Sequence, residues 1–500
     1  MIERGKDEAS QVWGDLRAAH RAASDEGRPA AIAKQHGRGS ISARERIARF
    51  VDPGSFVEYG MLAGPLDPAV SAPADGVVTG VGTLEGRAAA ILSYDYTVLG
   101  GSQGAHGHAK LERLFRTVEQ LGCPLIAMIE GGGGRANESS EGRGNGMVDY
   151  ILMARLSGRV PLIGVVFGRA FAGHAALAGL CDVVIARRSA TMGIAGPPLV
   201  SAAIGQTLSP EEIGSAELHA RVGTVDILVD DDEAALAAAA TYLGLLSEKQ
   251  RAFGKPIGCD EPLRALVPAN LRRAYDIRKV VERLADPGTM LELRSGWARN
   301  IVTVLARIAG ISVGIVANQP MHLGGAIDSP ASDKAARFIN LCDRFGLPLL
   351  MLVDTPGFLV GPGAEEQALI RHSSRLVLAM ARFSGVAMSV LIRKAYGLAF
   401  WAMASRAFDP LLHIAWPTAE FGAMGLEGAA KLIAGPDAPP ERIAQIVDDL
   451  REQGSPLTLA GRVMIDDVID PAETRMLLAR ALRLQSSSPS GGSRLPLDSW

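Results

Sequence analysis

The sequence predicts an α/β protein built from two tandem copies of one domain, and three observations lead to that prediction. Residues 122–134, GCPLIAMIEGGGG, return 224 positions later as residues 346–358, GLPLLMLVDTPGF. Both apolar runs are continuous, which is typical of parallel strands that are covered on both faces. Apolar runs also alternate with helical stretches along each half, which indicates βαβ crossovers.

The repeat extends well beyond this pair of strands. At the same offset the following residues match: Gly86 and Gly310, Leu99-Gly100-Gly101 and Leu323-Gly324-Gly325, Lys110 and Lys334. The register then slips by one, so that RAFAGHA (169–175) faces KAYGLAF (394–400). We therefore predict an N-terminal domain over residues 1–255, a C-terminal domain over 256–485 and a disordered tail over 486–500.

The elements of each half are predicted in the same order. A strand leads into a glycine turn and a helix; a buried strand, a second glycine turn and a second helix follow. A third buried strand then runs into a turn of small residues and an Ala-rich helix. In the first half these three strands are RAAAILSYDYTV (87–98), LIAMI (125–129) and the start of PLIGVVFGRAFAGHAALAGL (161–180). Before them, residues 7–35 read as a charged helix.

Composition excludes several classes of function. The net charge is −3 with both signs interspersed, which gives no electrostatic case for nucleic acid or an anionic membrane surface. The four cysteines form no CxxC pair, so neither a zinc ribbon nor a disulfide framework is expected. The longest nearly apolar stretch, 161–186, contains Arg169, His174 and Asp182, each costly inside a bilayer. We expect a soluble, cytoplasmic protein without a metal.

The turns of small residues are the candidate chemical feature. A strand that enters a helix through Ala172-Gly173, or through Gly397-Leu398-Ala399, leaves main-chain N–H groups without helical partners. Such donors stabilise a developing oxyanion, although small residues at these places also let a helix pack closely on a sheet. The occurrence of the turn in both halves, with Gly-rich strand ends at 131–134 and 357–361, favours function.

Several familiar motifs are incomplete here. Gly100 to Gly104 fit the nucleophile elbow around Ser102, but the repeat has Ala326 at the serine position. Asp354-Thr355-Pro356-Gly357 resembles a GTPase switch, yet the chain has no GxxxxGK[ST] phosphate loop. His106 and His108 could bind a metal, but no carboxylate–cysteine cluster accompanies them.

Three further ionisable residues stay ambiguous at this point. His174 either satisfies a buried backbone group or lines a site. Glu130 and Asp354 end equivalent strands, where acids often cap or brace loops. A site with donors but no obvious base fits a reaction whose substrates supply the base.

The same segments resemble a known family, the carboxyltransferase β subunits of biotin-dependent acyl-CoA carboxylases, such as propionyl-CoA carboxylase β, in the crotonase superfamily. The similarity runs from about residue 36 to 480. It is carried by HGRGSISARERIARFVDPGSFVE (36–58), DYTVLGGSQG (95–104), the run from 314 to 350, VDTPGFLVGPGAEEQALIRHSSRLV (353–377), RKAYG (393–397) and IDDVIDPAETR (465–475).

The resemblance implies two crotonase-like β-β-α domains per chain, usually assembled as a hexamer that takes part in fatty acid metabolism. It implies transfer of a carboxyl group from carboxybiotin on a partner, a biotin carboxylase or biotin carboxyl carrier subunit, to an acyl-coenzyme A. The active site would lie between the N-domain of one subunit and the C-domain of a neighbour. CO2 would leave the carboxybiotin, the biotin anion would take the α-proton, and the enolate would attack the CO2.

Site residues follow from the resemblance by position. Ala172 and Gly173 would hold the thioester enolate, and Leu398 and Ala399 the biotin ureido oxygen. The substrate-binding candidates are Gly132, Gly133, Phe171, His174, Gly196 and Trp401; the biotin-binding candidates are Gly357, Phe358, Tyr396 and Gly397.

Departures from the family leave alternatives open. The family often has Gly-Gly in place of Ala172-Gly173 and Gly-Ala in place of Leu398-Ala399, and propionyl-type members have Asp in place of Trp401. The chain could instead be the decarboxylase subunit of a biotin-linked sodium pump. It could also be a catalytically weak structural paralogue, or a hydratase or thioesterase that works without biotin.

Overall fold

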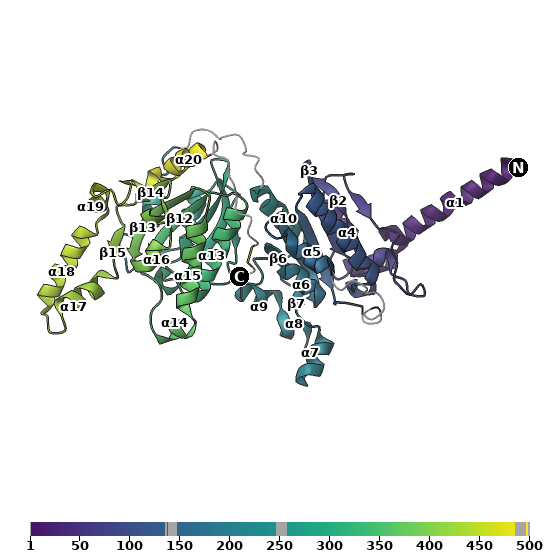
Figure 1. Cartoon of the computed structure of the whole chain (residues 1–500), viewed down its shortest axis with the longest axis horizontal. Coiled ribbons are helices and arrows are strands. Elements are labelled where there is room, and N and C mark those ends of the chain that lie inside the picture. The colour runs from purple at the N-terminus through teal and green to yellow at the C-terminus, as the bar shows by residue number, and fades with distance from the viewer. Residues whose placement is uncertain (1, 136–137, 139–147, 247–257, 486–496, 499–500) are drawn as a thin grey trace. The chain divides into compact units, whose positions relative to one another are not determined.

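The computed structural model describes residues 2–135, 138, 148–246, 258–485 and 497–498 (Figure 1). The chain divides into two compact units between Ala240 and Thr241. The predicted boundary at residue 255 lies outside the described residues. So do residues 486–496 and 499–500, which make up most of the predicted tail.

A mixed sheet of eight strands forms the centre of the first unit. Its strands are β1 (Val57–Tyr59), β2 (Val77–Leu84), β3 (Arg87–Tyr94), β4 (Leu125–Gly131), β5 (Leu162–Phe171), β6 (Val183–Arg187), β7 (Thr191–Gly193) and β8 (Ile227–Val229). The order is β1-β2-β3-β4-β5-β6-β8, with β7 paired to β5. The β1–β2 and β2–β3 pairs are antiparallel, and the remaining pairs are parallel.

The second unit repeats this sheet strand for strand. Its strands are β9 (Leu291–Leu293), β10 (Ile301–Ile308), β11 (Ile311–Asn318), β12 (Leu349–Thr355), β13 (Ala387–Tyr396), β14 (Leu412–Ala415), β15 (Glu420–Gly422) and β16 (Asp467–Val468). The order is β9-β10-β11-β12-β13-β14-β16, with β15 paired to β13. The predicted class, two α/β domains related by duplication, is confirmed.

The pairing registers show how closely the two copies agree. Ala90 pairs with Leu125, and Gly314 pairs with Leu349, both 224 positions later. Leu125 then pairs with Leu162, whereas Leu349 pairs with Ala387, which reproduces the slip of one residue. The extra residue of the second unit therefore lies between β12 and β13, in the connection that carries two helices, and it leaves the sheet intact.

Burial explains the continuous apolar runs of β4 (125–129) and β12 (349–353), which each end in an acid. Every residue of both strands is buried, because helices cover the sheet. Each sheet and its covering helices enclose a separate hydrophobic core. Continuous apolar runs at these positions therefore reflect strands that face protein on both sides.

Two long amphipathic helices pack on the sheets at equivalent places, α4 (Ala105–Leu121) and α13 (Ser329–Arg344). Each buries a lysine whose ammonium group binds backbone carbonyls. Lys110 Nζ donates to the oxygen of Ala74 at 2.9 Å, and Lys334 Nζ donates to that of Ile301 at 2.8 Å. The matched lysines therefore anchor the chain segment that enters the sheet in each unit.

The other helices are shorter or lie at the edges. In the first unit they are α1 (Ile2–Ala23), α2 (Pro29–His36), α3 (Ala43–Phe50), α5 (Val148–Leu156), α6 (Gly173–Gly179), α7 (Pro197–Ile204), α8 (Pro210–Gly214) and α9 (Ala216–Arg221), followed by α10 (Asp232–Leu246) at the division between the units. In the second they are α11 (Leu263–Leu266), α12 (Arg278–Leu284), α14 (Pro362–Glu366), α15 (Leu369–Arg382), α16 (Gly397–Trp401), α17 (Leu426–Ala434), α18 (Pro440–Gln453), α19 (Pro456–Gly461) and α20 (Thr474–Gln485). The predicted N-terminal helix is observed as α1 and α2, with α1 extending away from its sheet (Figure 1). Over the described part of the chain, no helix has the length and apolar character needed to cross a membrane.

Candidate active site

The first turn of small residues joins β5 to α6. Ala172 bends the chain with φ 52° and ψ −118°, and α6 begins at Gly173. The Ala172 N–H donates to the Gly193 carbonyl at 2.9 Å, as part of the β5–β7 pairing. The sheet therefore already uses this donor, and the role of Ala172 in holding the enolate stays a prediction. Among the described residues, the Gly173 and His174 amides have no backbone acceptor, as expected for a first helical turn.

The second turn joins β13 to α16, which begins at Gly397 with Tyr396 as its N-cap, one position earlier than the equivalent start of α6. Gly397 adopts φ 60°, and the Leu398 and Ala399 amides likewise lack a backbone acceptor within the described residues. The register places Gly397 opposite Ala172 in the repeat, so Leu398 is the structural equivalent of Gly173. The Leu398 side chain is 75% exposed and that of Trp401 is 53% exposed, while Ala399 is fully buried.

Two glycine loops lie beside these turns, at the ends of β4 and β12. Gly133 has φ 108° and Gly357 has φ 129°, conformations that L side chains rarely adopt. The Gly132 N–H donates to the Gly100 carbonyl at 3.3 Å. Phe358 forms an isolated parallel bridge with Ile327. The sequence-predicted glycines therefore shape the carboxyl edge of each sheet, where open α/β sheets bind ligands.

The His174 side chain supports the first glycine loop from the core side. Its side chain is fully buried, and its Nδ1 accepts a hydrogen bond from the Gly133 N–H at 3.2 Å. Burial lowers the pKa of His174 to about 3, so the ring is neutral near neutral pH. Of the two interpretations left open by the sequence, the contacts favour the satisfied backbone group.

Phe171 and Gly196 occupy neighbouring positions in the first unit. The Phe171 side chain is only 1% exposed, so it contributes to the packed wall beneath the turn. Gly196 is the N-cap of α7, and a methyl group built on it would lie 3.9 Å from Phe171 Cβ. Both residues border the turn, Phe171 from inside the core and Gly196 from the helix that follows β7.

The acids that end β4 and β12 are bound by arginines. Arg46 Nη2 lies 2.6 Å from Glu130 Oε2, and Arg393 Nε lies 2.8 Å from Asp354 Oδ2. All four side chains are buried. Glu130 therefore ties β4 to α3, and Asp354 ties β12 to β13. Neither carboxylate is exposed for use as a base.

The arginines reach the acids by different routes. Arg46 comes from α3 and stacks on Phe167, with 4.0 Å between the guanidinium carbon and the ring centroid. Arg393 comes from β13 itself and stacks on Tyr275 at 4.7 Å. The position equivalent to Arg393 in the first unit is Gly168, so the duplicated fold keeps the ion pair while its source has changed.

The incomplete motifs of the sequence have structural roles. Ser102 accepts a hydrogen bond from Arg135, and His106 contacts the Gly64 carbonyl at 2.6 Å. His108 Nδ1 lies 2.8 Å from the Asp149 carboxylate. In the described ranges, no three histidine, cysteine or acidic side chains gather as they would around a metal ion.

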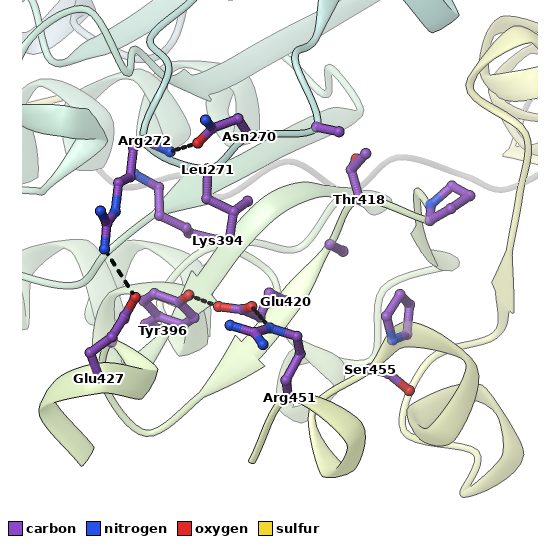
Figure 2. A pocket seen from close by; sticks show the side chains of 15 residues that line it. Asn270, Leu271, Arg272, Lys394, Tyr396, Thr418, Glu420, Glu427, Arg451 and Ser455 are labelled. Atoms are coloured by element: carbon purple, nitrogen blue, oxygen red, sulfur yellow. Dashed lines mark hydrogen bonds and ion pairs between the residues drawn. The ribbon is translucent and has the colours of Figure 1, made fainter. Parts of the chain in front are cut away.

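The second unit contains a cavity of about 880 Å3 beside its turn (Figure 2). Lys394 and Tyr396 of β13 form part of its wall, on one face of the strand because they are two residues apart. The other lining residues are Ala269, Asn270, Leu271, Arg272, Pro417, Thr418, Ala419, Glu420, Gly425, Glu427, Arg451, Ser455 and Pro456. Of the lining residues, the sequence pointed to Tyr396 as a site residue. Lys394 lies on the same strand and Glu420 on β15, and most of the others come from loops and helices far apart in the chain.

A chain of polar contacts crosses this cavity. The Tyr396 hydroxyl donates to Glu420, and Arg451 Nε lies 3.4 Å from the same carboxylate (Figure 2). Burial, together with the hydrogen bond to Glu420, raises the pKa of Tyr396. Burial lowers the pKa of Lys394, whose Nζ donates to the Gly324 carbonyl at 3.2 Å. The cavity thus offers both hydrogen-bond acceptors and positive charge to a polar ligand.

Comparison with known proteins extends across both units. A model of the carboxyl transferase domain matches residues 34–493. The methylmalonyl-CoA carboxyltransferase 12S subunit of Propionibacterium freudenreichii subsp. shermanii is 37% identical over 476 residues, 91% of this chain and 90% of that protein. The propionyl-CoA carboxylase beta chain of Roseobacter denitrificans is 36% identical over 485 residues, 93% and 94% of the two chains. The fold matches the crystal structure of transcarboxylase 12S, described as a hexamer, with a TM-score of 0.88 and 34% identity over 96% of this chain and 95% of that one.

Proposed function

The chain belongs to the carboxyl transferase family, and on that premise we propose that it transfers a carboxyl group between biotin on a partner protein and the α-carbon of an acyl-coenzyme A. The observation that carries this proposal is the pair of equivalent turns, each with main-chain N–H groups at the carboxyl edge of a sheet. Two carbonyl oxygens gain negative charge during such a transfer, one on the thioester and one on the ureido ring. A duplicated turn supplies a set of donors for each.

The first turn is assigned to the thioester. The Gly173 amide, with that of His174, donates to the thioester oxygen and holds the negative charge that grows there as the α-proton leaves. One backbone donor of this kind contributes about 2.7–4 kcal/mol of transition-state stabilisation. Glu130 and Asp354 are bound by arginines, so the base is expected to come with the substrates. Gly132 and Gly133 flank the same turn, and Gly196 and Phe171 border it.

The second turn is assigned to biotin. When bound, biotin supplies the carboxyl group as a labile N-carboxylate. The Leu398 and Ala399 amides would donate to the ureido oxygen, with Gly357, Phe358 and Gly397 shaping the edge of the site. The adjoining cavity of about 880 Å3 fits a compact polar ring, because ligand sites commonly enclose about 300–1,000 Å3. Its Tyr396, Glu420 and Lys394 groups match a ring that both donates and accepts hydrogen bonds.

Transfer in the opposite direction uses the same donors, so a decarboxylase subunit stays an alternative. A catalytically weak structural paralogue is a second alternative, motivated by the bulky Leu398 and Trp401 side chains at the second turn. Their exposures of 75% and 53% leave both side chains at the surface of the unit. Trp401 is proposed to influence which acyl group is accepted.

The proposal is tested by decarboxylation of malonyl-, methylmalonyl- and longer carboxyacyl-coenzyme A in the presence of free biotin. We expect turnover of at least one member of the panel, dependent on biotin. Replacing Gly173 by valine should reduce kcat by about 100-fold or more, which is the effect of losing one oxyanion donor. Size-exclusion chromatography of the Gly173→Val protein shows whether the assembly is intact.

Two outcomes would contradict the proposal. Turnover of none of the carboxyacyl-coenzyme A compounds by the intact protein would remove its basis. Full activity of an intact Gly173→Val protein would show that the first turn does not bind the reacting oxygen. Turnover of an enoyl- or acyl-coenzyme A without biotin would favour the hydratase or thioesterase alternative.

Two further parts of the proposal concern the setting of the reaction. We propose a homohexamer that works with a biotin carboxylase or biotin carboxyl carrier subunit, as the hexameric transcarboxylase 12S structure supports. We also propose a cytoplasmic location. All four cysteines are free thiols, and Cys123, Cys181 and Cys342 are buried, which fits a reducing compartment.

A further inference from the structure

Gln103 is hydrogen-bonded to four residues around the first turn: Tyr94, Gly133, Arg135 and Tyr150. Its backbone N–H donates to the backbone carbonyl of Gly133 at 2.9 Å, and its backbone carbonyl accepts from the backbone N–H of Arg135 at 2.8 Å. Its side chain is 7% exposed and donates through Nε2 to the Tyr94 hydroxyl at 2.8 Å. The Tyr150 hydroxyl donates to Gln103 Oε1 at 3.1 Å.

This hydrogen bond lies directly against Gly173. A methyl group built on Gly173 would be 2.1 Å from Gln103 Oε1 and 2.2 Å from the Tyr150 hydroxyl oxygen. Both distances are far shorter than a van der Waals contact. Two polar atoms therefore occupy the space that a side chain would need, and they restrict how the Gly173 backbone can move.

The second unit provides an internal comparison. Ile327 stands at the position equivalent to Gln103 and makes the same two backbone hydrogen bonds, to Gly357 at 3.1 Å and from Leu359 at 2.8 Å. Gln103 forms an isolated parallel β-bridge with Gly134, and Ile327 forms the equivalent bridge with Phe358. The Ile327 side chain is apolar and fully buried. The fold therefore accepts an apolar residue here, and the glutamine side chain is not needed for the bridge between the loops.

We propose that Gln103 and Tyr150 are positioning residues of the first turn, which clamp Gly173 so that its amide points at the thioester oxygen. This inference rests on the proposed function. The clamp is specific to the acyl side, since the equivalent of Gln103 on the biotin side cannot form it. Tyr150 is half-buried on α5, so its hydroxyl reaches the turn from the surface side while Tyr94 closes the network from the core.

The test uses Tyr150→Phe, Gln103→Ile and the double variant in the full chain. Gln103→Ile copies the residue that the second unit already holds at this position. We expect Tyr150→Phe to lower kcat for the carboxyacyl-coenzyme A by about three- to tenfold, the range for one lost hydrogen bond. Gln103→Ile should lower kcat by at least as much, because it also removes the hydrogen bond to Tyr94. The double variant should be no slower than Gln103→Ile, because that change already removes the bond that Tyr150→Phe removes.

The KM for free biotin is the control for a general loss of structure, because a misfolded protein would also lose its biotin site. The KM for free biotin should stay within twofold of wild type in all three variants. Tyr59→Phe on the edge strand β1 is the matched control and should retain wild-type kcat. A variant with wild-type kcat, or with losses that multiply in the double variant, would overturn the clamp.

A space-filling test addresses the clamp directly. Gly173→Ala places a methyl group against both oxygen atoms, and Tyr150→Phe in the same chain removes one of them. We expect Gly173→Ala to lower kcat. Adding Tyr150→Phe to that variant should raise kcat again by at least threefold. Failure of any rescue, with the protein folded, would count against the clamp.

Failure of the proposed function is distinguishable from failure of this inference. If the wild-type protein turns over no carboxyacyl-coenzyme A, the function fails. The clamp is then tested by calorimetric binding of a non-hydrolysable ketone analogue of propionyl-coenzyme A, which has CH2 in place of the thioester sulfur and keeps the carbonyl oxygen. Weaker binding to Tyr150→Phe than to Tyr59→Phe, by about threefold or more, would support the clamp. Equal binding to both would overturn it.

Discussion

His174 shows, at the scale of a single residue, how an ionisable group beside the proposed thioester-binding turn can serve the backbone. The side chain is fully buried against Tyr94, with 4.2 Å between the ring centroids. Its Nδ1 holds the Gly133 N–H, which fixes the glycine loop next to Gly173. Protonation would remove this acceptor, so the loop depends on a neutral ring.

The acid stability of the fold should therefore depend on His174. Its pKa is about 3 in the folded chain and 6.5 ordinarily, so between these values the unfolded chain binds a proton that the folded chain does not. The free energy of unfolding is fully retained above pH 6.5 and falls, by on the order of 4 kcal/mol, as the pH drops toward 3. His174→Asn keeps an oxygen acceptor near Nδ1 and cannot titrate.

The measurement compares urea midpoints at pH 7.5 and pH 5. We expect the wild-type midpoint to fall more steeply between the two conditions than that of His174→Asn. His20→Asn, on the exposed surface of α1, is the control and should follow wild type. Parallel pH dependence in all three proteins would show that His174 titrates normally.

At the scale of the element, the two strand–turn–helix junctions differ in the residue that makes the bend. Ala172 takes φ 52° and ψ −118°, a conformation that suits glycine, and Gly397 takes φ 60° at the equivalent position. A non-glycine residue in such a conformation costs about 1–3 kcal/mol. The first unit thus holds strain at the turn that binds the proposed thioester.

This difference predicts opposite effects of two exchanges. Ala172→Gly should raise the free energy of unfolding by about 1 kcal/mol, since glycine adopts the bend without strain. Gly397→Ala should lower it by a similar or larger amount, because the new methyl group also lies 3.1 Å from the Ala423 carbonyl oxygen. Denaturant titration of both variants checks the prediction, and a change of the same sign in both would contradict it.

At the scale of the whole molecule, duplication provides two copies of a sheet that each end in an amide-bearing turn. The copies keep the same strand order and nearly the same register. They have diverged in the residues around the turns. Gln103 of the first unit corresponds to Ile327 of the second, and the arginine that binds Glu130 comes from a different element than the arginine that binds Asp354. On the proposed function, one duplicated fold would in this way hold two different carbonyl groups.

Mixed assemblies test whether one active site uses both halves of neighbouring copies. Gly173→Val disables the first turn, and Leu398→Pro removes the amide hydrogen of the second. Each protein alone should be inactive. Co-refolded or co-expressed, they should recover a measurable fraction of wild-type turnover, at most about half, because intact halves then meet in some sites. No recovery in a mixed assembly of confirmed size would show that both turns must come from one chain.

The sequence by itself determined the duplication, the fold class and the place of both turns. Local patterns suffice for these features: buried parallel strands need unbroken apolar runs, and bends into a helix need small residues. GCPLIAMIEGGGG and GLPLLMLVDTPGF are read directly from the chain and appear as β4 and β12 with their glycine loops.

Only the tertiary structure decided which groups around the turns are free. It showed that Gly193 already occupies the Ala172 amide, that His174 faces the core, and that arginines from other elements neutralise Glu130 and Asp354. It also gathered the cavity of Lys394, Tyr396, Glu420 and Arg451 from segments scattered over the second half. These facts depend on contacts between residues far apart in the chain. Hydrogen-bond pairing and burial are set by those contacts, and no local pattern encodes them.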